Sequence, residues 1–315
     1  MDSHLVIGEA LIDIVHSVDG SVREHVGGSP LNVAIGLRRL GHDVTLATCI
    51  GADVHGELIE QVLRDDGVRL GAHSAESPRT STAAATLDPT GAATYAFDLE
   101  WNPVPPLPHL SGHLHTGSIA TVLQPGASTV RDAVVGHRAR GTTSFDPNLR
   151  PTIIGDAASV RSGIEELVGL SDVVKASDED IEWLYGHDGA EVDLTQILRL
   201  WAQLGPSLAV ATLGSDGALV YLSGADEVVK VPGLRVDLID TVGAGDSFMS
   251  GMLSSLLDSG LLGDVEARQR LRGAGRDVLL EAVDRAIAAS AITVSRAGSN
   301  PPVRSELISA GPGPH

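Results

Sequence analysis

Apolar runs of strand type alternate with segments of helical spacing along most of the chain. The runs are HLVIGEALIDIV (4–15), DVTLATCIG (43–51), HLHTGSIA (113–120), TTSFDPNL (142–149), DVVKAS (172–177) and SLAVATLG (207–214). This alternation predicts repeated strand–helix–strand units, and therefore an α/β fold whose mostly parallel central sheet is covered by helices on both faces. Ligands of such sheets bind beyond the carboxyl ends of the strands, where the distinctive motifs of this chain fall.

The segment from Arg79 to Trp101 departs from this alternation. It places a DPTG turn between two β-rich stretches, which predicts a hairpin standing off the main sheet. We expect the hairpin (79–101) and residues 13–26 to form a small β lid, with the Pro-rich NPVPPLP (102–108) leading back to the main body. Residues 1–310 then form a single domain, and 311–315 a disordered tail.

Charge and composition narrow the class of protein. The 315-residue chain has a formal charge of −19, which disfavours nucleic acid as a partner because phosphate backbones require a basic surface. No apolar run is long enough to span a bilayer and the N-terminus has no export signal, so a cytoplasmic protein without a membrane partner is expected. Cys49 is the only cysteine and lies in an apolar run, as expected of an inert buried thiol.

The stretch DTVGAGDSFMSGML (240–253) joins a glycine-rich wedge to an apolar helix. Small residues at Gly243, Ala244 and Gly245 let backbone N–H groups converge, and the positive N-terminal end of the helix points to the same place. This combination predicts an anion site. Asp246 would repel an anion there unless it accepts a proton from the group that attacks that anion, so we predict Asp246 as a general base.

A second motif, GGSPLNVAIGLRRLG (27–41), marks the limits of a helix. The limits are Ser29 as N-cap, Pro30 as first helical residue and Gly41 as C-terminal stop. Asn32 then lies in the first turn beside the Gly27-Gly28 pair. Either the glycines only make a tight turn, or bare backbone and an amide side chain hold a hydroxylated ligand.

Three other places have both a structural and a functional interpretation. Asp13 is a carboxylate on an otherwise apolar strand, which a polar ligand at the strand end or a partner in the core would explain. Arg150, in the rigid bend DPNLRP (146–151), is placed where it could meet a substrate oxygen or a phosphate. The stretch TLGSDGALVY (212–221) predicts a hairpin turn, and its glycines would equally admit a nucleotide.

Other chemistries have little support in the sequence. His113 and His115 share a strand face, as a metal pair would, but no further His or Cys cluster completes a ligand set nearby. The chain lacks G-x-x-x-x-G-K-[ST], which excludes a P-loop enzyme. It also lacks GxGxxG after the first strand, which disfavours a dinucleotide-dependent oxidoreductase on a similar sheet.

Taken together, GGSPLNVA followed by Gly41 and Gly51, and DTVGAGDSFMSGML, resemble the two signatures of the ribokinase-like (PfkB) family of sugar kinases. Two long signatures in this order are specific, and the similarity extends from VIGEALID to SRAGSNPP (295–302). The resemblance implies an enzyme that transfers phosphate from ATP to an alcohol group. It also implies that Asp246 is the catalytic base and that the amides of residues 243–245 form an anion hole.

The resemblance implies further roles by position. Sugar contacts are implied at Asp13, Gly28 and Asn32, with Gly27 and Arg150 as neighbouring substrate-binding candidates. Nucleotide contacts are implied at Thr212, Gly214 and Gly217. A monovalent cation, K⁺ in our prediction, is implied at Asp240 and the carbonyls around Val242, Thr293, Arg296 and Gly298.

One motif departs from the family pattern. Where many members carry Asn-x-x-Glu near the metal and the phosphates, this chain has Ser177-x-x-Asp180. Asp180 is shorter than Glu but can still hold Mg²⁺ through water. Lys175, just before this motif, either approaches the phosphates of the nucleotide or is a snorkelling lysine at a strand end.

Within the family, VIGEALIDIV, LHTGSIA and FDPNLRP look most like the fructokinase branch, whose product is fructose 6-phosphate. The 2-keto-3-deoxygluconate kinases and the ribokinases remain alternatives, as does a catalytically silent sugar-binding paralogue. A homodimer joined through the lid is a further expectation, because apolar residues on the outer faces of the lid would be partly exposed in a monomer. These residues are Ala83, Ala85, Leu87, Tyr95 and Phe97.

Overall fold

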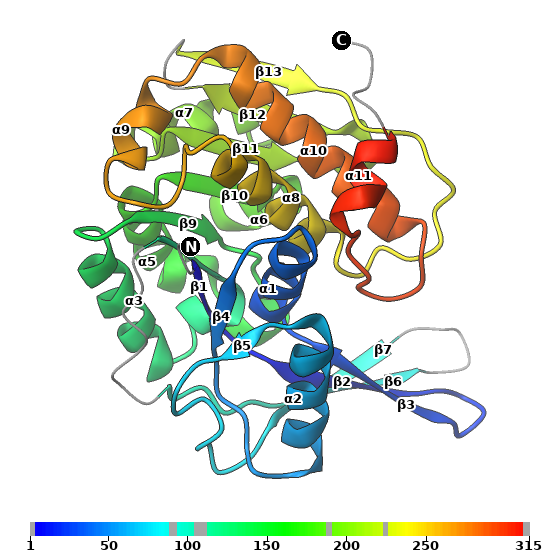
Figure 1. Cartoon of the computed structure of the whole chain (residues 1–315). Helices are drawn as coiled ribbons and strands as arrows, with labels where there is room; N and C mark the ends of the chain where they lie inside the picture. The colour runs from blue at the N-terminus through cyan, green and yellow to red at the C-terminus, as the bar shows by residue number, and fades with distance from the viewer. Residues whose placement is uncertain (1–3, 88–92, 104–111, 187–190, 223–225, 311–315) are drawn as a thin grey trace.

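A large central sheet between two layers of helices, with a smaller sheet projecting from it, makes up the chain (Figure 1). The computed structural model describes residues 4–87, 93–103, 112–186, 191–222 and 226–310. The predicted DPTG turn (88–91), most of the Pro-rich segment and the tail from residue 311 lie outside these ranges. None of the helices in these ranges combines the length and the apolar character needed to cross a membrane.

The central sheet has the strand order β13-β12-β11-β10-β9-β8-β1-β4-β5. Its strands are β1 (His4–Ile7), β4 (Val44–Ala47), β5 (Arg69–Leu70), β8 (His113–Gly117), β9 (Thr142–Asp146), β10 (Val173–Ser177), β11 (Leu208–Thr212), β12 (Ala218–Leu222) and β13 (Glu227–Val231). All neighbours from β5 to β11 are parallel, and only β11-β12 and β12-β13 are antiparallel. The prediction of a mostly parallel sheet is confirmed.

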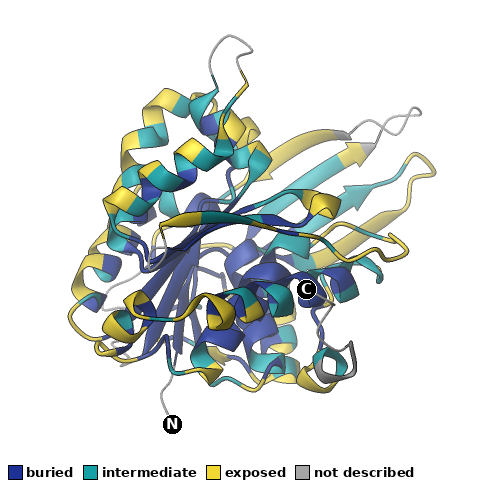
Figure 2. Ribbon diagram, turned by 90° about the horizontal axis from the view of Figure 1, so that it is seen from above, coloured by how far each residue is buried: buried dark blue, intermediate teal, exposed yellow. Residues whose placement is uncertain are grey.

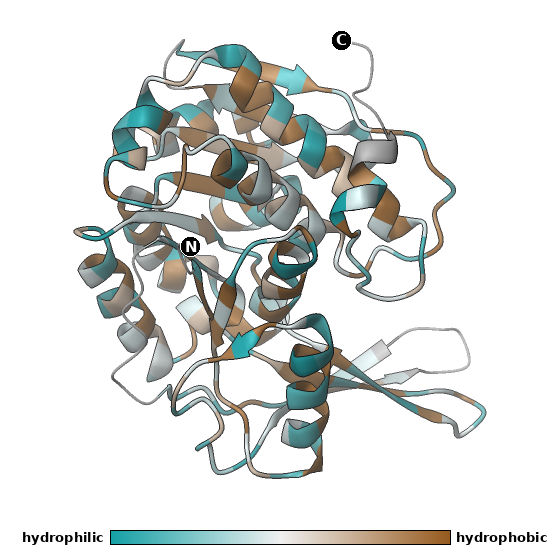
Figure 3. Ribbon diagram, viewed as in Figure 1, coloured by the Kyte–Doolittle hydropathy of each residue, from teal (hydrophilic) through white to brown (hydrophobic). Residues whose placement is uncertain are grey.

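Helices cover both faces of this sheet. One face carries α1 (Ser29–Arg39), α2 (Val54–Asp66), α8 (Ala244–Asp258), α9 (Ala267–Arg272) and α10 (Arg276–Val294); the other carries α3 (Gly126–His137), α5 (Ala157–Leu170), α6 (Asp178–Tyr185) and α7 (Leu194–Leu204). Short helices are η1 (Ser118–Thr121), α4 (Pro151–Ile154), η2 (Gly214–Asp216) and α11 (Arg304–Ala310). Successive strand residues point to opposite layers: Val6 belongs to the first cluster, Leu5 and Ile7 to the second. The inner strands are therefore buried on both faces (Figure 2), whereas the edge strands β5 and β13 are partly exposed. Helices α2 and α10 alternate hydrophobic and hydrophilic patches along their lengths (Figure 3).

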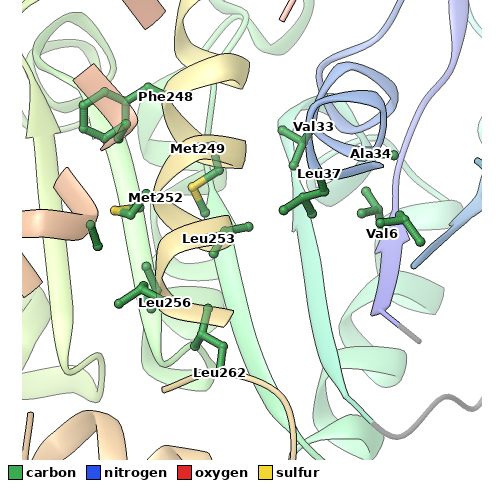
Figure 4. Close-up of a cluster of buried hydrophobic side chains, with 14 of the residues drawn as sticks. Val6, Val33, Ala34, Leu37, Phe248, Met249, Met252, Leu253, Leu256 and Leu262 are labelled. Atoms are coloured by element: carbon green, nitrogen blue, oxygen red, sulfur yellow. The ribbon is translucent and has the colours of Figure 1, made fainter. Parts of the chain in front are cut away.

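Two buried helix surfaces meet where α1 and α8 pack together. Figure 4 shows Leu253 of α8 pointing toward α1, which contributes Val33 and Leu37 to the same core. The helices approach closely at Gly36, where an added Cβ would lie 2.3 Å from Ser250 Oγ. This close approach sets the N-terminal ends of the two helices beside each other, and both glycine-rich motifs lie at those ends.

The smaller sheet has the strand order β3-β2-β6-β7. Its strands are β2 (Leu11–His16), β3 (Val22–Gly27), β6 (Ser81–Leu87) and β7 (Ala93–Asp98), so residues 13–26 and 79–101 do contribute a separate sheet. The run 4–15, expected as one strand, is instead two strands, β1 and β2, which belong to different sheets. The chain changes sheets at residues 8–10, where Gly8 lies so close to Pro30 that an added Cβ would be 2.1 Å from Pro30 Cγ.

The strand register places the exposed aromatic residues of the small sheet on the same face as Asp13. Ala83 pairs with both Asp13 and Phe97, and Ala85 pairs with both Val15 and Tyr95. Directly paired residues share a face, so Ala83, Ala85, Tyr95 and Phe97 lie on the face of the small sheet that carries Asp13. This face is partly exposed, as expected. The Tyr95 and Phe97 rings stack at 5.9 Å and are 56% and 37% exposed. The side chain of Leu87 lies outside the described part of the chain.

Candidate active site

Asp246 lies in the first turn of α8 and is held by two side chains of α1. Ser29 Oγ donates to Asp246 Oδ1 and Asn32 Nδ2 donates to Asp246 Oδ2, both at 2.7 Å. The carboxylate is 7% exposed. It is therefore fixed in orientation, while each oxygen keeps a lone pair with which it can accept a proton.

Ser29 has a different role from the predicted one. The N-cap of α1 is Gly28, with φ of 116°, and no side chain caps the helix. The Ser29 hydroxyl turns instead to Asp246, because the start of α8 lies against the start of α1. The prediction that Ser29 is the N-cap is wrong. Pro30 in the first turn and Gly41 just after the helix, with φ of 93°, agree with the predicted limits.

The Gly27-Gly28 pair allows close approach of the groups around it. An added Cβ would lie 2.2 Å from Asp13 Oδ2 at Gly27, and 2.4 Å from the Glu9 carbonyl oxygen at Gly28. The predicted sugar-contact residues of β2, β3 and α1 are thus gathered beside Asp246. The alternative that the glycines only form a tight turn does not explain why a carboxylate and an amide converge on them.

Glu9 is an acidic residue of this region that the sequence did not single out. It is 5% exposed, and its Oε2 accepts a hydrogen bond from Ala120 N at 3.2 Å. Burial raises the pKa of Glu9 to about 7, although a hydrogen bond from Ser118 and the charge of Arg150 lower it. Asp13 has the same pattern: burial raises its pKa, and the charges of Arg150 and His25 lower it. One arginine therefore acts on two acids.

Arg150 is exposed and braced by its own loop. Its Nη1 donates to Asn148 Oδ1 at 2.6 Å, and to the carbonyl oxygens of Asn148 and Leu149. Asn148 has φ of 39°, so the bend is tight, as the DPNLRP motif predicted. The loop leaves the rest of the guanidinium available at the carboxyl end of β9, on the side of Glu9 and Asp13.

The predicted anion site is at the N-terminal end of α8. Gly243 is its N-cap, with φ of 76°, a conformation that favours glycine. Ala244 N donates to the Thr241 carbonyl oxygen at 3.2 Å, so the loop already uses one of the three predicted amides. The N–H groups of a first helical turn have no acceptor within the helix, which leaves Gly243 and Gly245 as the principal donors.

Lys175 lies directly under this loop. Its Nζ is 2.8 Å from Asp146 Oδ2, and the two side chains are 4% and 0% exposed. An added Cβ at Gly245 would lie 3.0 Å from the same ammonium nitrogen. A snorkelling lysine would reach solvent, so that alternative is wrong. The other alternative, an approach to the phosphates of the nucleotide, stays a prediction.

Asp180 and Ser177 form the start of α6. Ser177 Oγ accepts from Asp180 N at 3.0 Å, and Asp180 Oδ2 accepts from Ser177 N at 3.1 Å, which is a reciprocal capping box. Asp180 Oδ1 accepts from Leu149 N at 2.7 Å and so ties α6 to the loop of Arg150. The carboxylate keeps lone pairs for a water-mediated metal contact, so the residue fits a hydrated Mg²⁺.

Two loops that were predicted to hold a monovalent cation lie together. Asp240 Oδ1 accepts from Val242 N at 3.0 Å and Oδ2 from Gly298 N at 2.8 Å, and these bonds lower the Asp240 pKa. Ile239 N donates to the Val294 carbonyl oxygen at 2.8 Å. Thr293 is fully buried and bonded to Ser247, whereas the Arg296 side chain turns away to Glu306. Backbone carbonyls and one ionised carboxylate are ligands that suit a hard cation.

The predicted nucleotide residues flank the turn between β11 and β12. Thr212 Oγ1 donates to the Ala176 carbonyl oxygen at 3.4 Å, at the carboxyl end of β11. Gly214 has φ of 54° and open space around its Cβ position. Gly217 has φ of 95°, and a Cβ there would lie 2.0 Å from the Val231 carbonyl oxygen. The turn itself therefore requires glycine at position 217, whereas the open space at Gly214 is compatible with a ligand.

The histidines of β8 belong to a buried polar cluster, whose member His115 lies near Lys175. His113 bonds to Thr142 Oγ1 at 2.9 Å and to Ser144 Oγ at 2.7 Å, and His115 bonds to the same Ser144 at 2.9 Å. Burial lowers the pKa of His115 to about 3. Within the described ranges, no three or more His, Cys, Asp or Glu residues are arranged to hold a metal ion.

Three residues of the site were not among the predicted ones: Glu9, Ser29 and Asp146. Asp146 follows an apolar strand at its carboxyl end, so its position beyond TTSF was a usable signal. Glu9 lies inside an apolar run, and an unpartnered acid in such a run was a comparable signal. Ser29 gave no signal, because its hydroxyl suits an N-cap equally well.

Comparisons with known proteins cover most of the chain. The model of the pfkB family carbohydrate kinases matches residues 1–306. The chain is 33% identical to a fructokinase of Klebsiella pneumoniae, over 81% of this chain and 85% of that protein, and 36% identical to a fructokinase of Rhizobium leguminosarum bv. trifolii, over 82% and 81%. A fructokinase double mutant of Vibrio cholerae O395, solved with fructose, ADP and potassium ion bound, superposes with a TM-score of 0.75 at 28% identity, covering 98% of this chain and 95% of that one.

Proposed function

Because the chain belongs to the pfkB family of carbohydrate kinases, we propose that it transfers the γ-phosphoryl group of ATP to a primary hydroxyl of fructose, giving fructose 6-phosphate and ADP. Family membership makes it a phosphotransferase that acts on a sugar hydroxyl. The observation that carries the proposal is the position of Asp246. Ser29 and Asn32 fix it between the glycine pair that precedes α1 and the glycine loop that precedes α8.

In the proposed reaction, Asp246 accepts the proton of the sugar hydroxyl as that oxygen attacks the γ-phosphorus. The new O–P bond forms while the bond to the β-phosphate oxygen breaks, and ADP leaves. The amides of Gly243 and Gly245 donate to the oxygens of the moving phosphoryl group and stabilise its charge. Ser29 and Asn32 keep the Asp246 carboxylate aimed at the hydroxyl throughout.

The sugar would lie against Gly27, Gly28, Asp13 and Asn32, whose polar groups can donate to and accept from hydroxyls. The charges beside that position support a neutral sugar. Arg150 acts on both Glu9 and Asp13, and His25 also acts on Asp13, so a substrate carboxylate would compete with these two acids for the Arg150 guanidinium. Like-charge contacts of this kind cost several kcal/mol, which favours fructose over 2-keto-3-deoxygluconate.

We also propose Mg²⁺ and K⁺ as cofactors. Asp180 would contact Mg²⁺ through water, and Asp240 with the carbonyls of residues 293–298 would hold K⁺. Bound Mg²⁺ would neutralise phosphate charge during transfer. The Vibrio cholerae fructokinase was solved with potassium ion bound, which supports the choice of monovalent cation.

A homodimer joined through the small sheet is part of the proposal. Tyr95 and Phe97 expose a stacked apolar pair on the face of Asp13, and a second copy of the sheet would cover it. Such a dimer would place one sheet near the sugar entrance of its partner, because Asp13 and the aromatic pair share that face.

The proposal is tested by ADP release in a coupled assay over fructose, tagatose, ribose, 2-keto-3-deoxygluconate and nucleosides. We expect kcat/KM for fructose to exceed that for 2-keto-3-deoxygluconate by about 10²-fold, the size of one unfavourable charge contact. Preferred turnover of the sugar acid would contradict the assignment. A protein whose melting temperature rises with fructose but that turns over no sugar would be the silent sugar-binding paralogue.

A further inference from the structure

Lys175 and Asp146 form an ion pair inside the protein. Lys175 is the middle residue of β10, and Asp146 is the last residue of the neighbouring parallel strand β9. The two strands are in register at Val173–Ser144 and Val174–Phe145. Their charged atoms are 2.8 Å apart, with 4% and 0% of the side chains exposed. Burying two charges is expensive, so such a pair is weak evidence of stabilisation and needs another explanation.

A second buried pair shows how a structural ion pair is built in this chain. Arg268 and Asp172 are 2.6 Å apart, and Asp172 directly precedes β10. Arg268 also donates to the carbonyl oxygens of Arg138 and Gly141, and Asp172 also accepts from Thr143 N. Both residues of that pair thus have additional partners, which offset the cost of burial.

The Lys175–Asp146 pair lacks this support. Beyond the ion pair itself, neither carboxylate oxygen of Asp146 has a hydrogen-bond partner in the part of the chain that the structure describes. Burial raises the Asp146 pKa to about 6, against the effect of the Lys175 charge. A buried ion pair without further hydrogen bonds is poorly suited to stabilise a fold, but it is suited to hold a positive charge beside an anionic ligand.

The Lys175 ammonium lies beside the loop that is predicted to bind the transferring phosphoryl group. A Cβ built on Gly245 would be only 3.0 Å from Lys175 Nζ, so the nitrogen lies immediately beside the anion loop. The charged and titratable groups that face it are His115 of β8, Asp146 of β9, Asp180 of α6 and Asp246 of α8. Three acids thus surround one cation before an anion arrives.

We propose that Asp146 and Lys175 act as one unit, in which Asp146 is a positioning residue that holds the Lys175 ammonium against the anion loop, and Lys175 is a catalytic residue that contacts the transferring phosphoryl group. The proposal rests on the proposed kinase function. The fixed ammonium adds a full positive charge to the two backbone dipoles of Gly243 and Gly245, which compensates for the loss of one amide to the Thr241 carbonyl. No proton moves to or from the pair during transfer.

The first test replaces each buried cation by a similar uncharged side chain. Lys175→Met removes the proposed catalytic charge, and Arg268→Met removes the cation of the matched pair at the start of β10. We expect kcat to fall by about 10² to 10³-fold in Lys175→Met and by less than about threefold in Arg268→Met. The affinity for the sugar, measured by calorimetry, should stay within about threefold of wild type in both.

Further variants keep the test decisive if Lys175→Met does not fold. The double variant Asp146→Leu with Lys175→Met leaves no unpaired buried charge, so it should fold and show the same loss of kcat. Lys175→Arg should recover part of the lost kcat, because it restores the positive charge but replaces the compact ammonium by a larger planar guanidinium. A merely structural pair would show neither the kcat loss in the folded double variant nor the recovery.

Asp146→Asn tests the positioning role through the pH profile. Asp146 holds the Lys175 pKa up against burial, so its loss lets burial lower that pKa. We expect kcat to fall about tenfold and its alkaline limb to move to lower pH, with sugar affinity unchanged. All assays use the sugar with the highest wild-type kcat/KM, so a wrong sugar assignment does not affect the comparison. A folded Lys175→Met or double variant with kcat within about fivefold of wild type would overturn the proposal.

Discussion

The two sheets of this protein differ in how they are buried. Strands of the central sheet have helices on both faces, and β1, β4, β8 and β9 are buried along their whole lengths. The small sheet lacks such cover: most of β3 is exposed, and Tyr95 and Phe97 of β7 are in contact with solvent. Figure 2 shows this as a buried centre with a partly exposed sheet beside it.

The difference separates two tasks. Asp246, Lys175 and Asp146 lie in or against the well-packed body, where close packing holds charged groups in one geometry. Asp13 stands on the small sheet and contacts the same site from a less constrained element. In the proposed mechanism, phosphoryl transfer relies on the rigid part, whereas the choice of sugar relies in part on a sheet that packing constrains less.

The largest effect is expected at the base. Asp246→Asn removes the proton acceptor but keeps a side chain of the same shape, so kcat should fall by about 10² to 10⁴-fold. Sugar affinity should remain near normal, since Gly27, Gly28 and Asp13 are unchanged. Steady-state kinetics and calorimetry check both parts. Turnover close to wild type would remove Asp246 from its proposed role.

The next effect concerns acids at the junction of the sheets. Burial raises the pKa of Glu9 from 4.5 to about 7, so its contribution to stability is present below pH 4.5 and is lost as pH rises through 7. Relative to Glu9→Gln, the wild type should lose on the order of 3 kcal/mol of unfolding free energy across that range. Chemical denaturation between pH 4.5 and 8 measures this difference.

Asp13→Asn is the control for that experiment. Burial also raises the Asp13 pKa, but Asp13 is less buried, so its effect should have the same sign and a smaller size. Subtracting each variant from the wild type removes the opposite contribution of His42 and His115. The pKa values of these two histidines are lowered to about 4 and about 3, so their contribution to the unfolding free energy decreases as pH falls. If the unfolding free energies of the wild type and Glu9→Gln change with pH in parallel, the raised pKa of Glu9 is contradicted.

One substitution made in both sheets compares their packing directly. Val210 on β11 is fully buried, whereas Val22 on β3 is 53% exposed. Val210→Ala should lower the unfolding free energy by about 2–3 kcal/mol through lost burial and a residual cavity, and Val22→Ala by no more than about 0.5 kcal/mol. Urea denaturation followed by circular dichroism measures both. Equal losses would show that the small sheet is packed as tightly as the central one.

The smallest effect on the monomer concerns its exposed aromatic pair. Replacing Tyr95 and Phe97 by Ser should change monomer stability by less than about 1 kcal/mol, because both rings are exposed. If a second copy covers them, the variant should lose the dimer, and light scattering at micromolar concentration should then give the monomer mass. A wild type that is already monomeric would contradict the proposed dimer.

Much of the fold followed from patterns that are local in sequence. Alternating strand and helix runs predicted the parallel sheet, and the β-rich segments 13–26 and 79–101 marked the second sheet. Pro30 and Gly41 bounded α1 as expected. These features depend on backbone preferences and on residues within one or two turns of each other, which a sequence displays directly. The split of run 4–15 was missed because the apolar pattern continues from one strand into the next, with only residues 8–10 between them.

The sequence alone determined the α/β architecture, the two glycine-rich motifs and the acid that follows the second of them. Only the tertiary structure decided that Ser29 bonds to Asp246, 217 residues away, and that Lys175 is buried against Asp146. It also decided that Tyr95 and Phe97 share a face with Asp13. A side chain's type limits what it can bond to, but which partner it meets depends on how distant helices and strands pack, and no local pattern contains that information.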